Sequence, residues 1–403
     1  MKRRDVVTEQ DADLGMDLSA LSRGNVEAPW RPVPPFTGVN LGGWFVLEPW
    51  MQRSLFEGTG ADDEYGLLRA LGPRASARLL ARHRNTYITR DDLRWLLAAG
   101  VNAVRVPVGY WVLEDDPPFL AAGGILEEAL SWCDELHIAA VVDLHGLPGG
   151  QSSEHHTGRA GRGRWSLEAR HRDRSLDVVE ALAHACASHP SIAALELVNE
   201  PAKEIPAPLL QDYFEAAYQR VRRWCGPEAV AVAVTAFPEQ RLAEFRGAFP
   251  SPAFGSVVTD VHYYQCFGDW WSSRTIGQHL DAPQRMRGPE IRRESADRPL
   301  MIGEWSLRLP WSPRDVAREL PPGERDRVMR EFARAQLDAY SQAWGHFFWT
   351  YRAENEPEWS FRESIERGWI EAPIMRTRAA EGRMNALVRH LRALAAKGAR
   401  TDA

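Results

Sequence analysis

The stretch Phe36-Thr37-Gly38-Val39-Asn40-Leu41-Gly42-Gly43-Trp44 holds the first candidate strand, Phe36–Val39, and the turn that follows it. This turn distinguishes two α/β folds, an open doubly wound sheet and a closed barrel. A doubly wound sheet usually has the spacing Gly-x-Gly-x-x-Gly after its first strand, where backbone N–H groups bind phosphate. The glycines in this stretch do not have that spacing, which favours the barrel.

Seven further apolar runs have the length of strands, and stretches with apolar residues three and four positions apart separate them. The candidate strands are Ala103–Pro107, Ala139–Asp143, Ala194–Val198, Ala229–Thr235, Val257–His262, Leu300–Gly303 and His346–Thr350. The helical patterns include Ile125–Leu136, Arg174–Ser188, Pro208–Trp224 and Arg325–Trp344. Eight strands that alternate with helices predict an α/β fold, the (β/α)8 TIM barrel, as a single domain.

The composition bounds the class of protein. The chain has 403 residues, of which 44% are hydrophobic, so it can bury a large core and is not disordered. The formal net charge is −6 and no basic block is present, which argues against nucleic acid as a partner. The four cysteines lie far apart in the sequence, as expected of free thiols in a reducing compartment.

The ends of the chain indicate location and domain limits. No run of 18 apolar residues is present, and acidic residues follow the basic start where a signal peptide would be apolar. We therefore expect no signal peptide, no membrane contact and a cytoplasmic location. Residues 1–30 are predicted to form a polar, flexible arm, residues 31–394 the barrel and residues 395–403 a tail.

Six of the apolar runs end in, or are followed at once by, side chains that can carry chemistry. These side chains are Arg105, Asp143 and His145, Asn199 and Glu200, His262 and Tyr264, Glu304, and Trp349. In a barrel the C-terminal ends of all strands meet at the face that carries active sites. We therefore expect these side chains to converge on one site.

Glu200 and Glu304 are central to this set, since they should face each other across the barrel mouth. Two carboxylates that flank one bond are the usual equipment of glycoside hydrolysis. Either glutamate alone could instead cap a following helix, where the helix dipole favours a carboxylate. The pair, with arginine, histidine and tyrosine side chains around it, favours a catalytic site.

At these residues the sequence resembles glycoside hydrolase family 5, and within it the exo-β-1,3-glucanase branch. The motifs that carry the resemblance run from about residue 36 to residue 361. They are Gly38-Val39-Asn40-Leu41-Gly42-Gly43-Trp44-Phe45-Val46-Leu47-Glu48-Pro49-Trp50, Ser54-Leu55-Phe56-Glu57, Val104-Arg105-Val106-Pro107-Val108-Gly109-Tyr110-Trp111, Asp143-Leu144-His145-Gly146, Phe348-Trp349-Thr350 and Glu354-Asn355-x-Pro357-Glu358-Trp359-Ser360.

The resemblance implies a retaining glycoside hydrolase that cleaves β-glucosidic bonds by double displacement, with Glu304 as nucleophile and Glu200 as acid/base. Its partner would be a β-linked glucoside or oligosaccharide, and this chemistry needs no cofactor and no metal. Arg105 and Tyr264 would keep Glu304 ionised. We therefore expect a lowered pKa for Glu304 and a raised pKa for Glu200 in the free enzyme.

The same resemblance assigns roles to the surrounding residues. Asn199 would bind the sugar 2-hydroxyl, and His145 and His262 would order the site. Trp349 would form the floor under the sugar ring. The 16 tryptophans of the chain agree with such a role, because aromatic faces suit the apolar faces of sugar rings.

The glucose-binding end departs from the branch pattern. Glu48 matches a residue that binds the non-reducing terminal glucose, and Phe267 matches one half of an aromatic clamp at the pocket entrance. Where the branch normally carries an aromatic-acid-Asn stretch, this chain has Glu154-His155-His156-Thr157-Gly158. We therefore include His155 and His156 among the candidate substrate-binding residues, and the β-1,3 linkage preference stays open.

Several alternatives also stay open. The chain could be a relative that cleaves a lipid- or aglycone-linked glycoside, a transglycosylase, or a carbohydrate-binding barrel without turnover. The cluster at residues 154–156 could bind a metal, although its spacing is not that of a known site. The loop Arg159–Arg164 could be a solvated loop, a rim that binds an acidic leaving group, or a lid.

Overall fold

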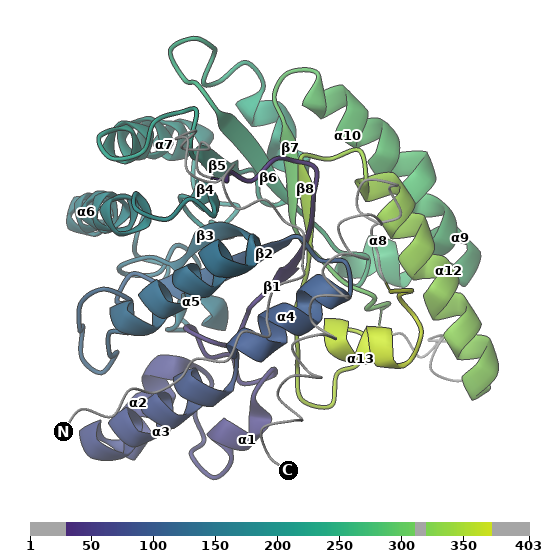
Figure 1. The fold of residues 1–403 in the computed structure, drawn as a ribbon, viewed down its shortest axis with the longest axis horizontal. Helices are drawn as coiled ribbons and strands as arrows, with labels where there is room; N and C mark the ends of the chain where they lie inside the picture. Colours follow the sequence, from purple (N-terminus) through teal and green to yellow (C-terminus); the bar gives the residue numbers. More distant parts are fainter. Residues whose placement is uncertain (1–29, 311–319, 373–403) are drawn as a thin grey trace, which may run out of the picture. The chain divides into compact units, whose positions relative to one another are not determined.

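Eight parallel strands, hydrogen-bonded in the order β1 to β8 and back to β1, close into a barrel in the computed structural model, which describes residues 30–310 and 320–372 (Figure 1). The strands are β1 (Phe36–Asn40), β2 (Ala103–Gly109), β3 (Ala139–Gly146), β4 (Ile192–Glu196), β5 (Ala231–Thr235), β6 (Val257–Tyr263), β7 (Leu300–Trp305) and β8 (Gly345–Phe348). The predicted (β/α)8 barrel is confirmed. The arm predicted at residues 1–30 and the tail at residues 395–403 lie outside the described residues, apart from Trp30.

Helices surround the strands (Figure 1). Those that follow one strand each and match a predicted pattern are α5 (Gly123–Leu136), α6 (Ala169–Cys186), α7 (Ala207–Arg222) and α12 (Pro322–Tyr340). The other helices, most of them shorter, are α1 (Arg53–Phe56), α2 (Glu64–Leu71), α3 (Pro73–Thr86), α4 (Arg90–Ala98), α8 (Gly268–Ser272), α9 (Ile276–Ala282), α10 (Gly288–Ser295) and α13 (Phe361–Glu366). No helix among the described residues is long and apolar enough to cross a membrane.

Two strand limits differ from the prediction in a way that matters for the site. β3 continues to Gly146, so Asp143 and His145 lie inside the strand. β4 ends at Glu196, so Asn199 and Glu200 lie in the loop after it. The sequence pattern missed this end because residues 197 and 198 are apolar and buried as well, although they no longer have regular strand pairing.

The interior of the barrel changes from apolar to charged along its axis. Alternate residues of each strand point inward. Near the N-terminal ends of the strands, small and apolar side chains fill the interior, among them Phe36, Ala103, Ala139, Val141, Ala194, Ala231, Val258, Met301 and Phe347. Two positions after Ala103, Val141, Ala194 and Val258, the side chains are ionisable, namely Arg105, Asp143, Glu196 and Asp260. All four are fully or almost fully buried.

Gly303 makes room for one of these side chains. The N–H of Gly303 donates to Asp260 Oδ1 at 2.7 Å, and a Cβ atom at this glycine would lie only 2.3 Å from that oxygen. The pairing of β7 with its neighbours shifts register beside Gly303, and such irregularities re-aim side chains. The next residue, Glu304, is the one that reaches the barrel mouth.

We predict that Gly303→Ala lowers the free energy of unfolding by about 1–3 kcal/mol, since the added methyl group overpacks against Asp260. Urea denaturation measures the change. Gly124→Ala is the matched control, because Gly124 lies in α5 with no heavy atom within 4 Å of the added Cβ. Equal stability of the two variants would contradict this packing argument.

Candidate active site

A pocket of about 640 Å³ opens at the C-terminal ends of the strands. It brings together most of the residues predicted from the sequence, namely Glu48, His145, His155, His156, Asn199, Glu200, Tyr264, Phe267, Glu304 and Trp349. The other two, Arg105 and His262, are buried beneath the pocket, where Arg105 contacts Glu304 and His262 contacts Glu200. The structure therefore places all predicted site residues at one end of the barrel.

Glu304 comes from β7 and is held by two donors. Arg105 Nη1 donates to Glu304 Oε1 at 3.0 Å, and the hydroxyl of Tyr264 donates to Glu304 Oε2 at 2.6 Å. The side chain of Glu304 is only 6% exposed. Its carboxylate is thus fixed in orientation from two sides.

Glu200 lies in the loop after β4, and its neighbours are histidines. His262 Nδ1 lies 2.6 Å from Glu200 Oε1, and His156 Nε2 lies 3.7 Å from Glu200 Oε2. The backbone of Glu200 has φ of 36°, a left-handed conformation that costs a residue with a side chain about 1–3 kcal/mol. Backbone strain of this kind is typical of functional sites, where it aims one side chain.

The two carboxylates share one site. One oxygen of Glu200, one oxygen of Glu304 and a ring nitrogen of His262 lie within 4.8 Å of one another. Carboxylates about 5–5.5 Å apart suit a double displacement, whereas about 6.5–9.5 Å would leave room for an inverting water. The geometry therefore favours a covalent intermediate on one glutamate.

The chain is similar in sequence to known glycosidases. A family model described as cellulase (glycosyl hydrolase family 5) matches residues 76–349. The chain is 30% identical over 375 residues to the probable glucan 1,3-beta-glucosidase A of Emericella nidulans, covering 84% of this chain and 90% of the relative. It is 31% identical to the glucan 1,3-beta-glucosidase of Yarrowia lipolytica, covering 83% of this chain and 88% of the relative.

The chain belongs to glycosyl hydrolase family 5. It is therefore a glycoside hydrolase with a carbohydrate substrate, and enzymes of this family are retaining glycosidases. Solved structures agree on the fold. Rutinosidase from Aspergillus niger superposes with a TM-score of 0.68 at 22% identity, covering 85% of this chain and 99% of that one. A family 5 enzyme from Prevotella bryantii superposes with a TM-score of 0.56 at 16% identity, covering 83% and 95%.

One buried cation organises the polar interior of this glycosidase. Arg105 is fully buried, and its Nε and Nη2 atoms donate to the two oxygens of Glu196 at 2.7 and 2.9 Å. Its Nη2 also lies 3.0 Å from Asp143, and further donations reach Asn40 and Asn199, both at 2.9 Å. Together with Glu304, three carboxylates thus share one guanidinium.

The pKa directions of the two glutamates are the reverse of those expected from the sequence. Burial raises the pKa of Glu304 to about 7, although His262 and Arg105 oppose the rise. For Glu200 burial also acts upward, but the hydrogen bond and charge of His262 outweigh it and lower the pKa to about 2. The expectation was wrong because it treated Arg105 as a partner of Glu304 alone, whereas Asp143 and Glu196 also contact this arginine. It also placed no cation beside Glu200, where His262 lies.

The part of the pocket around Glu48 contains an ion pair between this buried carboxylate and the partly exposed His155. His155 Nε2 lies 3.1 Å from Glu48 Oε2, and Trp50 Nε1 donates to the same oxygen at 2.8 Å. Burial alone would raise the pKa of Glu48, but the hydrogen bond and charge of His155 lower it. The ring of Trp349 is stacked with that of His145, with centroids 5.4 Å apart.

Aromatic side chains form one wall of the pocket. Trp359 contacts the rings of Trp50, Tyr264 and Phe267, with centroids 5.2 to 6.2 Å apart. Phe267 is 62% exposed, as expected for a residue at the entrance. This wall provides flat apolar surface suited to a sugar ring or to another planar group.

Three residues that line the pocket were not predicted from the sequence. Phe237, Arg53 and Glu356 all line the pocket, and Arg53 forms an ion pair of 2.7 Å with Glu356. Phe237 follows β5, and its position one residue after a buried apolar run was the available signal. Arg53 is the first residue of α1, and Glu356 lies in a loop 303 residues further along the chain, so no local pattern links them.

The arginine-rich loop does not reach the pocket. Arg159 lies over the ring of Tyr65 at 3.6 Å, and Arg164 pairs with Glu168 at 2.5 Å. Neither these two residues nor Arg162 line the pocket. Of the three interpretations of this loop, a solvated loop agrees best with these contacts, since Arg162 and Arg164 are exposed.

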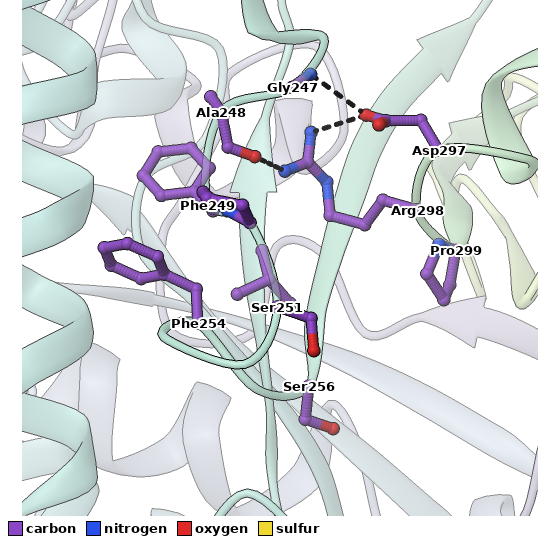
Figure 2. Close-up of a pocket in the computed structure, with 11 residues that line it drawn as sticks. Gly247, Ala248, Phe249, Ser251, Phe254, Ser256, Asp297, Arg298 and Pro299 are labelled. Carbon is purple, nitrogen blue, oxygen red and sulfur yellow. Dashed lines mark hydrogen bonds and ion pairs between the residues drawn. The ribbon is translucent and has the colours of Figure 1, made fainter.

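Two further features do not compete as the site. A second pocket of about 410 Å³, beside Asp297, Arg298 and Pro299, lies where β6 and β7 begin (Figure 2), and barrel enzymes work at the opposite end. The groups Glu196–Asp260–His262 and Glu200–His262–Glu304 are close enough to hold a cation. Glu196 and Glu304 contact Arg105, and Glu200 forms a short bond with His262. These contacts already account for the proximity, so we interpret the two groups as residues that share protons.

The buried carboxyl groups of the barrel interior predict that the free energy of unfolding falls as pH rises. Burial raises the pKa of Glu196 to about 8 despite its bonds to Arg105. A carboxyl group with a raised folded pKa stabilises the fold fully below its unfolded pKa, and this contribution is lost as pH rises through the folded pKa. For Glu196 the window runs from the ordinary glutamate pKa of 4.5 to about 8.

We therefore expect Glu196→Gln to flatten the fall of unfolding free energy between pH 5 and pH 8, by up to about 1.4 kcal/mol per pH unit. Denaturant titrations at four pH values measure the slope. The control is Glu228→Gln at an exposed position, which should keep the wild-type slope. A wild-type slope in Glu196→Gln would show that this carboxyl group does not carry the proton.

Proposed function

We propose that this family 5 enzyme is a retaining β-glucosidase of the exo-β-1,3-glucanase or β-glucosidase type, with Glu304 as nucleophile and Glu200 as acid/base. The observation that carries the proposal is the approach of the two carboxylates to within 4.8 Å, with His262 between them. The names of the relatives, glucan 1,3-beta-glucosidases, support a glucosidic substrate.

In the first half-reaction Glu304 attacks the anomeric carbon while a proton passes from Glu200 to the leaving oxygen. Arg105 and Tyr264 orient the nucleophile and stabilise its ionised form. In the second half-reaction Glu200 takes a proton from water, which releases the sugar from Glu304. Asn199 precedes Glu200 in the sequence and accepts a hydrogen bond from Arg105, which also contacts Glu304. At this position Asn199 can bind the sugar 2-hydroxyl.

Residues at both ends of the pocket recognise the glucose unit. Glu48, held by Trp50 and His155, accepts sugar hydroxyls, and Trp349 lies against the ring. His156 faces Glu200, and Phe267 stands at the entrance, where the leaving group or a second sugar contacts it. Glu154 also lines the pocket, but its side chain is exposed.

One observation favours a second candidate, a family relative that releases an aromatic or lipid aglycone. Phe237 and the wall formed by Trp359 and Phe267 present apolar surface near the acid/base. A transglycosylase uses the same covalent intermediate with an acceptor sugar in place of water. A panel of laminari-, cello- and gentio-oligosaccharides beside aryl and alkyl glucosides distinguishes these substrates, and product analysis detects transfer.

We predict that Glu304→Ala lowers the turnover of an aryl β-glucoside by at least about 10³-fold, because no nucleophile remains. In the wild-type enzyme a 2-fluoro-β-glucoside should leave a covalent adduct on the peptide that contains Glu304, detected by mass spectrometry. The first product should be the β-anomer by NMR. Release of the α-anomer, or full activity of the variant, would refute the mechanism.

We predict that His155→Ala raises KM for glucosides more than it lowers kcat, because Glu48 loses its charged partner at the glucose-binding end. Glu48, which loses its partner in this variant, contacts the substrate in the ground state and in the transition state alike. Glu154→Ala, a substitution next to it on the same loop, is the control and should change KM less. An unchanged KM in His155→Ala would remove this histidine from substrate binding.

The cytoplasmic location stays a prediction. Cys133, Cys186, Cys225 and Cys266 are free thiols in the structure, and the first three are buried, which agrees with a reducing compartment. Cell fractionation of the source organism, with a cytoplasmic marker enzyme alongside, tests it.

A further inference from the structure

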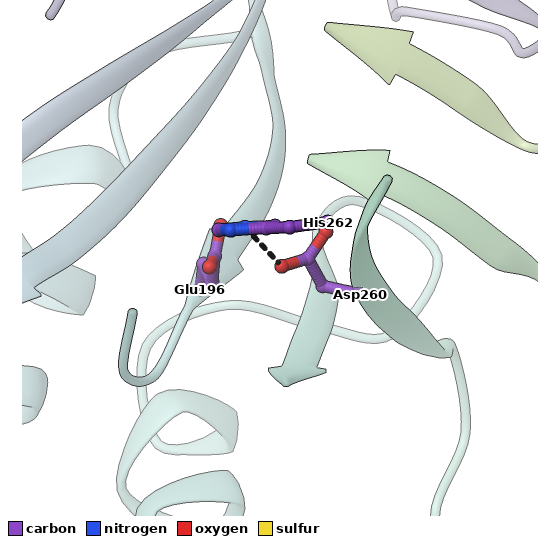
Figure 3. A group of neighbouring side chains, drawn as sticks. All are labelled: Glu196, Asp260 and His262. Carbon is purple, nitrogen blue, oxygen red and sulfur yellow. Dashed lines mark ion pairs between the residues drawn. The ribbon is translucent and has the colours of Figure 1, made fainter. Parts of the chain in front are cut away.

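His262 has a carboxylate at each of its two ring nitrogens. Its Nδ1 lies 2.6 Å from Glu200 Oε1, and its Nε2 lies 3.1 Å from Asp260 Oδ2 (Figure 3). The side chains of His262 and Asp260 are both fully buried. A ring nitrogen without hydrogen would repel a carboxylate, so Asp260 favours a proton on Nε2.

The position of Asp260 is fixed independently of His262. Its Oδ1 accepts the N–H of Gly303 at 2.7 Å, which leaves Oδ2 directed at the ring. The absence of a side chain at Gly303 provides the room for this carboxylate. Asp260 therefore sets both the orientation of the imidazole and which nitrogen carries the fixed hydrogen.

With Nε2 committed to Asp260, only Nδ1 remains to exchange a proton. At 2.6 Å, a single proton can sit on either side of the bond between Nδ1 and Glu200. Glu200 and His262 thus form one acid, and the carboxylate of Asp260 stabilises the positive charge that this acid places on the ring.

We propose that Asp260 is a positioning residue that makes His262 and Glu200 act as a single proton donor and acceptor in catalysis. The inference rests on the proposed role of Glu200. In the first half-reaction the pair gives one proton to the leaving oxygen and is left as ionised Glu200 and neutral His262. In the second half-reaction the pair takes one proton back from the attacking water, and Asp260 and the Nε2 hydrogen stay unchanged.

The nucleophile drives this exchange through its charge. Glu304 Oε2 lies 3.5 Å from His262 Nδ1, so ionised Glu304 favours the proton on the pair. Once Glu304 is bonded to the sugar, that charge is gone and the pair becomes a weaker acceptor of protons. The charged or titratable groups near the ring are Glu200, Glu304, Asp260, Glu196, Asp143, Arg105 and Tyr264.

The test compares two glucosides with different leaving groups. Phenyl β-glucoside needs a proton on its leaving oxygen, whereas 2,4-dinitrophenyl β-glucoside departs without one. Asp260→Asn keeps an oxygen for Gly303 but loses the charge. We expect kcat/KM of this variant to fall about tenfold or more with phenyl glucoside and about twofold or less with the dinitrophenyl compound. The basic limb of the pH profile should move down by about one unit or more.

Asp143→Asn is the matched control. Asp143 is as buried as Asp260, but its histidine partner is His145, at 2.6 Å. This variant should lower kcat/KM for both glucosides by similar factors. An equal loss with both glucosides in Asp260→Asn would reduce Asp260 to a structural role and overturn the inference.

Two measurements keep the result decisive. Glu200→Ala should show the same leaving-group selectivity, and if it does not, the proposed role of Glu200 fails first. If Glu200→Ala is selective and Asp260→Asn is not, only the inference fails. A ¹⁵N NMR titration of histidine-labelled protein, assigned with His262→Gln, gives a readout that does not depend on activity. The His262 midpoint should move to lower pH in Asp260→Asn, and an unmoved midpoint overturns the inference.

Discussion

The hydrogen bonds of one buried guanidinium set the arrangement of the barrel mouth. Arg105 contacts Glu196, Asp143 and Glu304, which come from β4, β3 and β7. A buried charge is costly unless its hydrogen bonds are satisfied, and here every nitrogen of the guanidinium has an acceptor. Because these acceptors lie on different strands, the closure of the barrel and the position of Glu304 depend on the same side chain.

The chemistry follows from the excess of carboxylates over cations. Arg105 cannot neutralise three carboxylates, and burial raises the pKa of Asp143 and Glu304 to about 7 each despite its charge. Protons must then occupy part of the interior near neutral pH. An enzyme that first gives and then takes a proton benefits from such an interior, because small changes in charge move the proton. In the proposed mechanism, the loss of charge on Glu304 is the change that the reaction itself supplies.

Position along each strand could be predicted from the sequence, whereas neighbours across the barrel could not. The apolar runs located all eight strands, and the residues after them located Glu200 and Glu304. Asp260 lies two positions before His262 on the same face of β6, a spacing that could have identified it. Neither the sharing of Arg105 by several acids nor the contact of His262 with Glu200 has a local signal, and together they reversed the expected pKa directions.

In the loop that departs from the branch pattern, as in the barrel interior, neighbouring charges set the pKa values of the buried acids. A second acid beside Glu48 would raise the pKa of both and favour a shared proton. The histidine at position 155 instead keeps Glu48 ionised, and its own pKa is raised because Glu48 outweighs the effect of burial. Glu48 then acts only as an acceptor, and the imidazolium adds a donor that a carboxylate lacks. If Glu48 and His155 bind substrate as proposed, an exchange of acid for histidine changes which sugar hydroxyls the pocket orients, while Glu200 and Glu304 are untouched.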